Sequence, residues 1–346
     1  MSEPFEIGIF TFGELTEDAA GRPYPAQQRL AEILQWAHVA DQAGLDVFGV
    51  GEHHRRDFAI SSPQMVLAAA AANTSRIRLT SAVTVLSSAD PVRVFEDFAT
   101  LDLISGGRAE LAVGRGAFVD SFPLFGQHLN RYGEYFEDRL GLLLQILDHN
   151  PVTWKGTTRP PLDASGIWPR PMQEKLPVWI AVGGTPSSVV RAGSLGLPLY
   201  LAILGNPASF APLAPLYRAS AHKAGREPQR IGVTSHLHLD RTSQGARDAF
   251  FEPYASYFAQ NMPQAGRLDR DTFEEWAGPD GALFAGSPAE VTEKILAEHE
   301  LLGHSRFLAQ VGLGGLPQAD TLASIELLAT EVLPAVRAAL APSTAS

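Results

Sequence analysis

The chain has 346 residues, and 45% of them are hydrophobic, which is enough to bury a large core. Its 38 Asp and Glu residues outnumber 27 Lys and Arg residues, and the resulting net charge of −11 argues against a polyanionic partner such as nucleic acid. The chain contains no cysteine, which excludes disulfides, thiolate metal sites and a cysteine nucleophile.

Short β-rich runs alternate with helical patterns along the whole chain. The predicted strands, each followed by helix, are 5–10, 46–50, 77–86, 109–114, 177–182, 198–204, 231–239 and 306–311. The helices are expected near 27–43, 63–74, 91–104, 131–148, 186–195 and 210–224, then in segments to about 302, and near 318–340. Eight uninterrupted strand–helix repeats favour an α/β fold of the closed (β/α)8 TIM-barrel type over an open doubly wound sheet, as a single domain over residues 1–346.

Two connections are longer than usual and predict insertions after strands four and seven. Residues 149–176 are rich in proline and aromatic residues, and residues 240–286 contain several aromatic side chains. Each is interpreted as a peripheral excursion, and for 240–286 a lid is the competing interpretation, because it follows strand seven at the rim where barrel active sites are built.

A polar cluster follows the second predicted strand in "GVGEHHRRDF", residues 49–58. Residues at the carboxyl ends of barrel strands face the active site, so Glu52 and its neighbours are candidates for catalysis. Neighbouring side chains of an extended backbone point to opposite sides, so one of His53 and His54 is expected to line the pocket while the other is structural. A polar rim cluster, satisfied by its own charges, is the alternative.

The seventh predicted strand carries His236, His238 and Asp240 on one face. With Leu237 and Leu239 packed outward on helices, both histidines are expected to point into the barrel. Such a pair would suit a metal-dependent hydrolase, but lining of a polar pocket without a metal is favoured.

Three stretches could bind an anion. Arg115 follows strand four, and "VGGTPSS" at 182–188 combines glycines and hydroxyls with the start of a helix, where Thr185 is expected as N-cap and Pro186 as the first helical residue. The glycine-rich segment 311–317 after strand eight is the competing candidate.

Taken together, these stretches resemble the bacterial-luciferase-like family of flavin-dependent monooxygenases. The similarity covers most of the chain and comprises "GEHH" after strand two, "LTSAVTVLSSADPVRVFEDFATLDLISGGRAELAVGRG" (79–116), "PVWIAVGGTPSSVVRAGSLGLPL" (177–199) and "VGLGGLP" (311–317). The resemblance implies a barrel that binds reduced FMN at its carboxyl-terminal mouth and reacts it with O2.

The resemblance also implies roles for particular residues. A non-prolyl cis peptide beneath the flavin maps onto Ala82 and Val83. The FMN phosphate would be held by Arg115 together with the strand-five residues Gly184, Thr185 and Ser188.

In the same way, Glu52 and His53 map onto the active centre, where His53 would do acid–base work with a pKa near neutral. His54 becomes a supporting residue, and Arg55 and Arg56 become rim or interface charges. The position that bears a reactive cysteine in luciferases is Gly114 here, a departure that argues against bioluminescence with an aldehyde substrate.

The leading hypothesis is therefore a monooxygenase that uses reduced FMN and O2 on a small, apolar organic substrate. No glycine fingerprint for a nicotinamide dinucleotide is evident, so a separate flavin reductase is expected to supply the reduced cofactor. The alternatives are a deazaflavin-dependent oxidoreductase of the same fold, the metal-dependent hydrolase, and a non-catalytic flavin-binding protein.

Localisation and assembly complete the expectations. The N-terminus lacks the basic start of a secretory peptide, and no stretch approaches the roughly 18 consecutive apolar residues of a membrane span, so we expect a cytoplasmic protein. The small-residue helix in 61–75 would permit close helix–helix approach, which favours a homodimer, as in related proteins.

Overall fold

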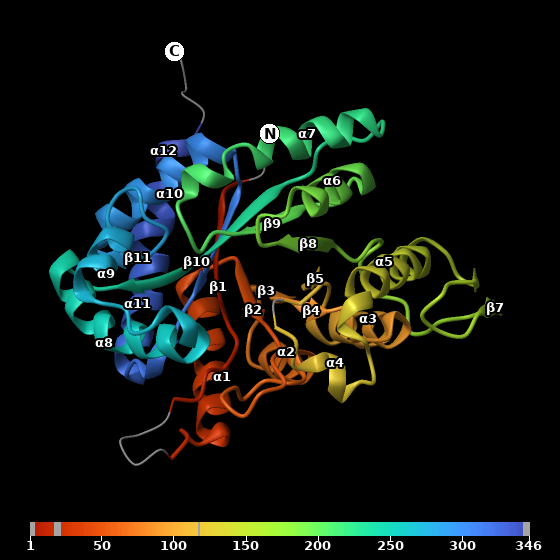
Figure 1. The fold of residues 1–346 in the computed structure, drawn as a ribbon, viewed down its shortest axis with the longest axis horizontal. Coiled ribbons are helices and arrows are strands. Elements are labelled where there is room, and N and C mark those ends of the chain that lie inside the picture. Colours follow the sequence, from red (N-terminus) through yellow and green to blue (C-terminus); the bar gives the residue numbers. More distant parts are fainter. Residues whose placement is uncertain (1–3, 17–21, 117, 342–346) are drawn as a thin grey trace.

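The computed structural model describes residues 4–16, 22–116 and 118–341. Within them, parallel strands close into an eight-stranded barrel, which confirms the predicted fold (Figure 1). The barrel strands are β1 Glu6–Thr11, β2 Val47–Val50, β3 Arg78–Ser81, β5 Ala109–Gly114, β8 Val178–Val182, β9 Leu199–Ala202, β10 Ile231–Leu239 and β12 Arg306–Gln310. The barrel is closed because β12 pairs with β1, and β10 pairs with both β9 and β12.

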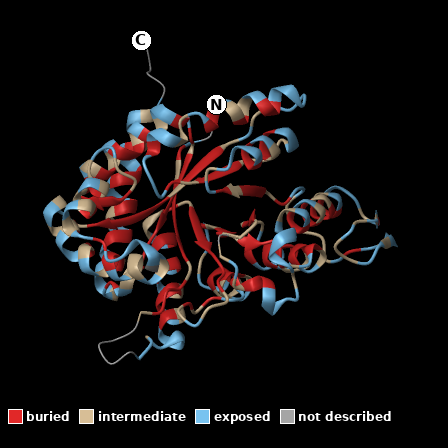
Figure 2. Ribbon diagram, in the orientation of Figure 1, coloured by how far each residue is buried: buried red, intermediate tan, exposed pale blue. Residues whose placement is uncertain are grey.

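Helices cover the outside of the barrel, and their buried faces point toward the strands (Figure 2). They are α1 Ala26–Ala43, α2 Pro63–Ala72, α3 Pro91–Ser105, α5 Tyr132–Asp148, α6 Pro186–Leu195, α7 Leu213–Lys223, α10 Pro288–Leu302, α11 Gln318–Leu327 and α12 Leu333–Leu340. Helices α1 and α6 end where the sequence predicts, at Gly44 and Gly196, whose φ angles of +100° and +66° lie in the left-handed region that favours glycine. None of the described helices is both long and apolar enough to cross a membrane.

The third predicted strand is not continuous. Its first part is β3, and its second part is the two-residue strand β4 Thr84–Val85, which pairs with the end of β5. Between them lies the peptide bond from Ala82 to Val83, which is cis as predicted. The prediction of one strand over 77–86 is therefore wrong at this bond, where the backbone turns out of the regular ladder.

The two insertions lie in different places. Residues 149–176 form the antiparallel hairpin of β6 Val152–Trp154 and β7 Leu162–Ser165, which packs beside α5 at the periphery (Figure 1). Residues 240–286 form α8 Ser243–Asn261, the short turn Pro263–Ala265, α9 Arg270–Ala277 and β11 Phe284–Gly286. Because β11 pairs with the last residues of β10, this insertion extends the sheet at the carboxyl end of the barrel.

The amino-terminal end of the barrel interior is filled by side chains. Arg306 is 1% exposed, and its NH1 group lies 2.6 Å from Glu110 Oε2 and 2.8 Å from the Tyr200 hydroxyl. The guanidinium also lies 4.4 Å from the ring centroid of Trp179, which stacks on Tyr200. A buried charge requires partners of this kind, and the resulting cluster occupies this end of the barrel interior.

Candidate active site

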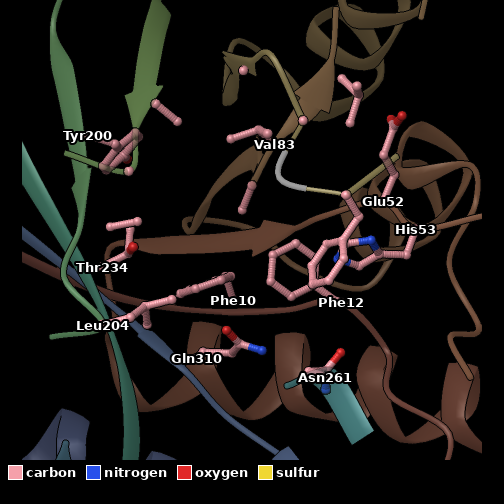
Figure 3. A pocket seen from close by; sticks show the side chains of 18 of the residues that line it. Phe10, Phe12, Glu52, His53, Val83, Tyr200, Leu204, Thr234, Asn261 and Gln310 are labelled. Carbon is pink, nitrogen blue, oxygen red and sulfur yellow. The ribbon is translucent and has the colours of Figure 1, made fainter. Parts of the chain in front are cut away.

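A cavity of about 630 Å³ opens at the carboxyl ends of the barrel strands. Every barrel strand or the loop that follows it contributes to the wall, and α8 and α9 cover part of the mouth. Figure 3 shows Val83 on one side of this cavity and Gln310 and Asn261 on the opposite side, with Phe12 and His53 between them. The position is the one at which residues of a (β/α)8 barrel meet a substrate.

An anion-binding arrangement lies where β8 leads into α6. Thr185 is the N-cap of this helix and Pro186 follows it, as predicted, although the Thr185 side chain caps no backbone amide. Arg115 lies beside this helix start. Its NH2 group is 3.5 Å from Thr185 Oγ1, and its NH1 group donates to the Tyr132 hydroxyl at 3.0 Å. A helix amino terminus beside an arginine favours a bound anion.

Ser188 adds an observation that points to a ligand. The side chain is 4% exposed and lines the cavity, yet its Oγ is buried without a hydrogen-bond partner among the described residues. A phosphate oxygen at this position would satisfy that hydroxyl. Gly184 has a φ of +100° and shapes the turn, while its neighbour Gly183 lines the cavity.

In the glycine-rich segment 311–317, the competing candidate for anion binding, the glycines allow close packing. A Cβ at Gly314 would meet the Pro253 carbonyl oxygen at 1.8 Å, and one at Gly312 would meet the Trp36 ring at 2.3 Å. No residue of 311–317 lines the cavity among the described residues. The geometry therefore favours the strand-five arrangement for an anion.

The cis peptide bond forms an apolar side of the cavity. Ala82, Val83 and Val85 all line it, next to the end of β5. A Cβ at Gly114 would lie 2.8 Å from Val83 Cγ2, so any side chain at position 114 would force Val83 to move. This contact is the physical reason why glycine, rather than a larger residue, suits position 114.

His53 lies in an aromatic cage. It is 9% exposed, and the centroid of its ring is 4.8 Å from Phe12, 4.3 Å from Phe58 and 4.8 Å from Phe118. Burial lowers the pKa of His53 to about 4, although Asp120, with an oxygen 4.0 Å from Nδ1, opposes the shift. The prediction of a pKa near neutral is therefore wrong, because loss of solvent outweighs the carboxylate.

Both histidines of the cluster line the cavity, so the prediction that one of them is structural is also wrong. Strand β2 ends at Val50, and the alternation of an extended strand no longer applies at His53 and His54. The backbone N–H of His54 donates to Asp120 Oδ2 at 2.6 Å, and its Nε2 lies 3.5 Å from Glu52 Oε1. The hydrogen bond to Glu52 raises the pKa of His54, so this histidine holds a proton more readily than His53 does.

The two arginines of the cluster lie outside the cavity wall. Arg55 pairs with Asp57 and lies over the rings of Phe58 and Phe118, both at 5.2 Å. Arg55, Arg56 and Asp57 line a separate polar hollow together with Ser256 and Gln260 of α8. Their rim position agrees with the prediction, and the Gln260 side chain donates to Asp57 Oδ2 at 2.9 Å, which links α8 to the loop after β2.

The strand-seven histidines separate in the structure. His236 lines the cavity, and its Nδ1 lies 2.9 Å from the Tyr254 hydroxyl. His238 is also buried but lies against the Phe250 ring at 5.4 Å and does not reach the cavity, because α8 covers this part of β10. In the part of the chain that the structure describes, no group of three or more His, Asp or Glu side chains could hold a metal ion.

Sequence reasoning missed two buried polar residues, Gln310, which lines the cavity, and Glu14, which is hydrogen-bonded to it. Gln310 donates from Nε2 to Glu14 Oε1 at 2.6 Å, and Glu14 is 5% exposed. Gln310 is the last residue of β12, so its place at the carboxyl end of a barrel strand was the available signal. Glu14 offers no comparable signal, because it lies in an irregular loop after β1.

The aromatic side chains contributed by 240–286 were also not assigned individually. They line the cavity, together with an amide and a thioether from the same segment. The residues are Tyr254, Tyr257, Phe258, Asn261, Met262 and Trp276.

Solved structures with the same architecture carry different cofactors. The monooxygenase RslO1 from Streptomyces bottropensis superposes with a TM-score of 0.83 at 26% identity, over 95% of this chain and 99% of that one. The oxygenating constituent of 3,6-diketocamphane monooxygenase from Pseudomonas putida, in complex with FMN, gives 0.77 at 20% identity over 96% and 99%. An F420-dependent secondary alcohol dehydrogenase, in complex with an F420–acetone adduct, gives 0.76 at 21% identity over 96% and 99%.

The sequence itself matches one family model over most of its length. The model is described as luciferase-like monooxygenase, and the match spans residues 5–305. This span includes the Glu52–His54 cluster, the cis peptide and the anion-binding arrangement. The chain belongs to the luciferase-like monooxygenase family.

Proposed function

We propose that the protein is a flavin-dependent monooxygenase that uses reduced FMN and O2 on a small organic substrate. The observation that carries the proposal is the unpartnered Ser188 hydroxyl beside Arg115 and the start of α6, at one end of an otherwise largely apolar cavity. Such a cavity suits a flat aromatic cofactor with a single phosphate. Reduced FMN supplies the electrons with which one atom of O2 enters the substrate while the other leaves as water.

We propose that the cofactor is bound by residues that line or shape the anion-binding end of the cavity and the apolar side formed by the cis peptide. Arg115, Gly184, Thr185 and Ser188 would hold the phosphate, since an arginine gives it an always-charged partner and the helix end adds donors that do not titrate. Ala82 and Val83 would lie beneath the flavin ring.

Proton handling falls to the cluster after β2. Glu52 and His53 remain the proposed catalytic residues, with His54 added to them. His53, neutral at pH 7, offers a hydrogen-bonding nitrogen inside its aromatic cage. Glu52 and His54 together can hold a proton at His54 Nε2, because the hydrogen bond to Glu52 raises the pKa of this histidine.

Exclusion of water is the task we assign to the insertion 240–286. Phe258 and Trp276, whose ring centroids are 5.3 Å apart, lie at the mouth with the tyrosines of α8. In a wet site O2 would be reduced to hydrogen peroxide without reacting with the substrate, so a closed aromatic mouth favours transfer of oxygen to the substrate. We propose that this segment acts as a lid.

A deazaflavin-dependent oxidoreductase is the second candidate, because an FMN complex and an F420 complex share this fold to nearly the same degree. Titration of the protein with oxidised FMN and with a deazaflavin, followed by fluorescence, separates the two. We expect FMN to bind and reduced FMN to drive O2 consumption with substrate. Binding of the deazaflavin alone would establish the second candidate, and binding of FMN without O2 consumption would establish a non-catalytic flavin-binding protein.

Cellular setting and assembly remain part of the proposal. We place the protein in the cytoplasm, with a separate flavin reductase as the source of reduced FMN, and we expect a homodimer that packs through α2. Sedimentation of the purified protein tests the dimer.

A further inference from the structure

A hydrogen-bonded pair of side chains, His236 and Tyr254, forms part of the cavity wall. His236 Nδ1 lies 2.9 Å from the Tyr254 hydroxyl oxygen, and both residues are 6% exposed and line the cavity. His236 belongs to β10 and Tyr254 to α8, so the pair joins the barrel to the insertion 240–286. It has no part in the proposed cofactor site or in the proton handling after β2.

The pair lies on a different side of the cavity from the anion-binding end. Strand β10 is separated by β9 from β8, the strand that leads into α6. In the ladder between β10 and β12, the residue opposite His236 is Gln310, which Figure 3 shows across the cavity from Val83. A ligand group that contacts the pair is therefore distinct from the anion that Arg115 and Ser188 would hold.

Both members of the pair are uncharged at pH 7. Burial lowers the pKa of His236 to about 4 and raises the pKa of Tyr254 above its ordinary value. A neutral imidazole carries one N–H and a neutral phenol one O–H, so the pair has two hydrogens for its single internal hydrogen bond. The second hydrogen is left over in either direction of that bond. It lies on His236 Nε2 when the hydroxyl donates, and on the Tyr254 oxygen when the imidazole donates.

The neighbouring amide of Gln310 does not use up this donor. The amide carries two hydrogens, of which one is donated from Nε2 to Glu14 Oε1 at 2.6 Å. A bond between the amide and the imidazole, in either direction, would use one of the two hydrogens that then remain on the three side chains. Because all three side chains line the cavity, at least one donor is left for a ligand.

Charged side chains disfavour an anionic ligand at this donor. Among the described residues that line the cavity, Arg115 is the one Arg or Lys, and it belongs to the anion-binding end. Glu52 and Asp120 also line the cavity and would repel a second negative charge. The rings of Phe258 and Trp276 would accommodate an apolar body. The oxygen that suits the pair is therefore an uncharged one on an otherwise apolar ligand.

We propose that the His236–Tyr254 pair binds the oxygen of an uncharged carbonyl or hydroxyl group of the substrate, and that the enzyme thereby selects neutral, otherwise apolar compounds over carboxylates. This inference rests on the proposed function, because the same cavity would hold flavin and substrate. The pair supplies one hydrogen to that oxygen, and its atom without a hydrogen is an acceptor for a hydroxyl group. Both residues are thus binding residues that set specificity.

Calorimetric titration with three probes of the same shape tests this. They are acetophenone, isopropenylbenzene, in which a methylene replaces the carbonyl oxygen, and benzoate. The full-length protein is titrated in saturating oxidised FMN, and again in inorganic phosphate without FMN, so that benzoate is not offered a free anion-binding end. We expect acetophenone to bind more tightly than isopropenylbenzene, and benzoate not to bind.

The double variant His236→Phe/Tyr254→Phe removes both hydrogens and keeps both rings. In this variant the affinity for acetophenone relative to isopropenylbenzene should fall by roughly threefold to tenfold, the size of one neutral hydrogen bond. The matched control is Tyr217→Phe/His222→Phe, because both residues lie on α7 and neither lines the cavity. The Tyr217 hydroxyl donates to the Leu197 carbonyl at 2.7 Å, and its loss should leave the ratio unchanged.

Infrared spectroscopy of the unmodified protein gives a result that does not depend on how the variants fold. The carbonyl stretching band of acetophenone, isotopically labelled at the carbonyl, moves to lower wavenumber when the oxygen accepts a hydrogen bond. We expect the band of the bound probe to lie below its position in hexane, and to return toward that position in the double variant.

The outcomes separate this inference from the proposed function. The inference is overturned by an unchanged ratio in the folded double variant, by a hexane-like band in the unmodified protein, or by equal binding of acetophenone and benzoate, whether or not FMN binds. Failure of FMN to bind, with the ratio in phosphate still dependent on the pair, overturns the flavin proposal and leaves the binding site standing.

Discussion

At the scale of single residues, burial changes the roles that sequence order suggests. His53 and His54 are neighbours in the chain, yet an aromatic cage lowers the pKa of His53 to about 4 while Glu52 raises the pKa of His54. The residue type and its place after β2 were predictable from the sequence. The pKa values were not, because they depend on Phe12, Phe58 and Phe118, which come from other parts of the chain.

Ser188 offers a direct test of the cofactor site. Ser188→Ala removes the buried hydroxyl that has no partner in the part of the chain that the structure describes. We expect the dissociation constant for oxidised FMN to rise about tenfold or more, the loss of one hydrogen bond to a charged group. Fluorescence titration measures the change. Ser187→Ala is the matched control, because this neighbouring serine is exposed and does not line the cavity. Equal affinities of the two variants would contradict the assignment.

At the scale of elements, the barrel strands position the site and the insertions finish it. The alternation of strands and helices was readable from the sequence, since each element carries its own periodicity. The cis peptide between Ala82 and Val83 was expected only from the family resemblance, and the break of the third strand there was not predicted, because no local pattern marks it. That α8 covers the mouth depends on the pairing of β11 with β10, a contact between distant segments.

The aromatic mouth predicts how tightly oxygen reduction is coupled to substrate. Trp276→Ala opens the cavity to water, and we expect a larger fraction of the electrons from reduced FMN to reduce O2 to hydrogen peroxide. The cost in stability should be no greater than the ~3–5 kcal/mol of a large core truncation. Peroxide is measured per reduced FMN supplied in air. Trp168→Ala is the control, because that side chain is 65% exposed on the peripheral insertion. A peroxide yield that rises equally in both variants would argue against a sealing role for Trp276.

At the scale of the whole molecule, the fold buries titratable groups far from the site. His304 is fully buried, neither ring nitrogen has a hydrogen-bond partner among the residues that the structure describes, and burial lowers its pKa from the ordinary 6.5 to about 3. Between these two values the unfolded chain binds a proton that the folded protein does not, so this residue makes the protein less stable as pH falls below 6.5.

Replacement of His304 by phenylalanine removes this pH dependence while keeping a ring against Phe5, whose centroid is 5.3 Å away. Urea unfolding at pH 7 and pH 5 should show that the loss of stability on acidification is smaller in His304→Phe than in the unmodified protein, by about 2 kcal/mol. An exposed histidine serves as control: His222→Phe should leave the loss unchanged, because its ring is in water in both states. An identical loss in His304→Phe would show that this burial does not govern the pH dependence.

The sequence alone determined the order of strands and helices, and with it the closed barrel, because periodicity and helix capping are local. It also determined that Glu52, His53 and Arg115 lie at the carboxyl-terminal end of the barrel, because parallel strands align their carboxyl ends. Tertiary structure decided what each side chain does there. It brought Glu14 from the loop after β1 against Gln310 of β12, left the Ser188 hydroxyl without a partner, and separated His236 in the cavity from His238 beneath α8. Burial and hydrogen-bond partners come from residues far apart in the chain, and no local pattern carries that information.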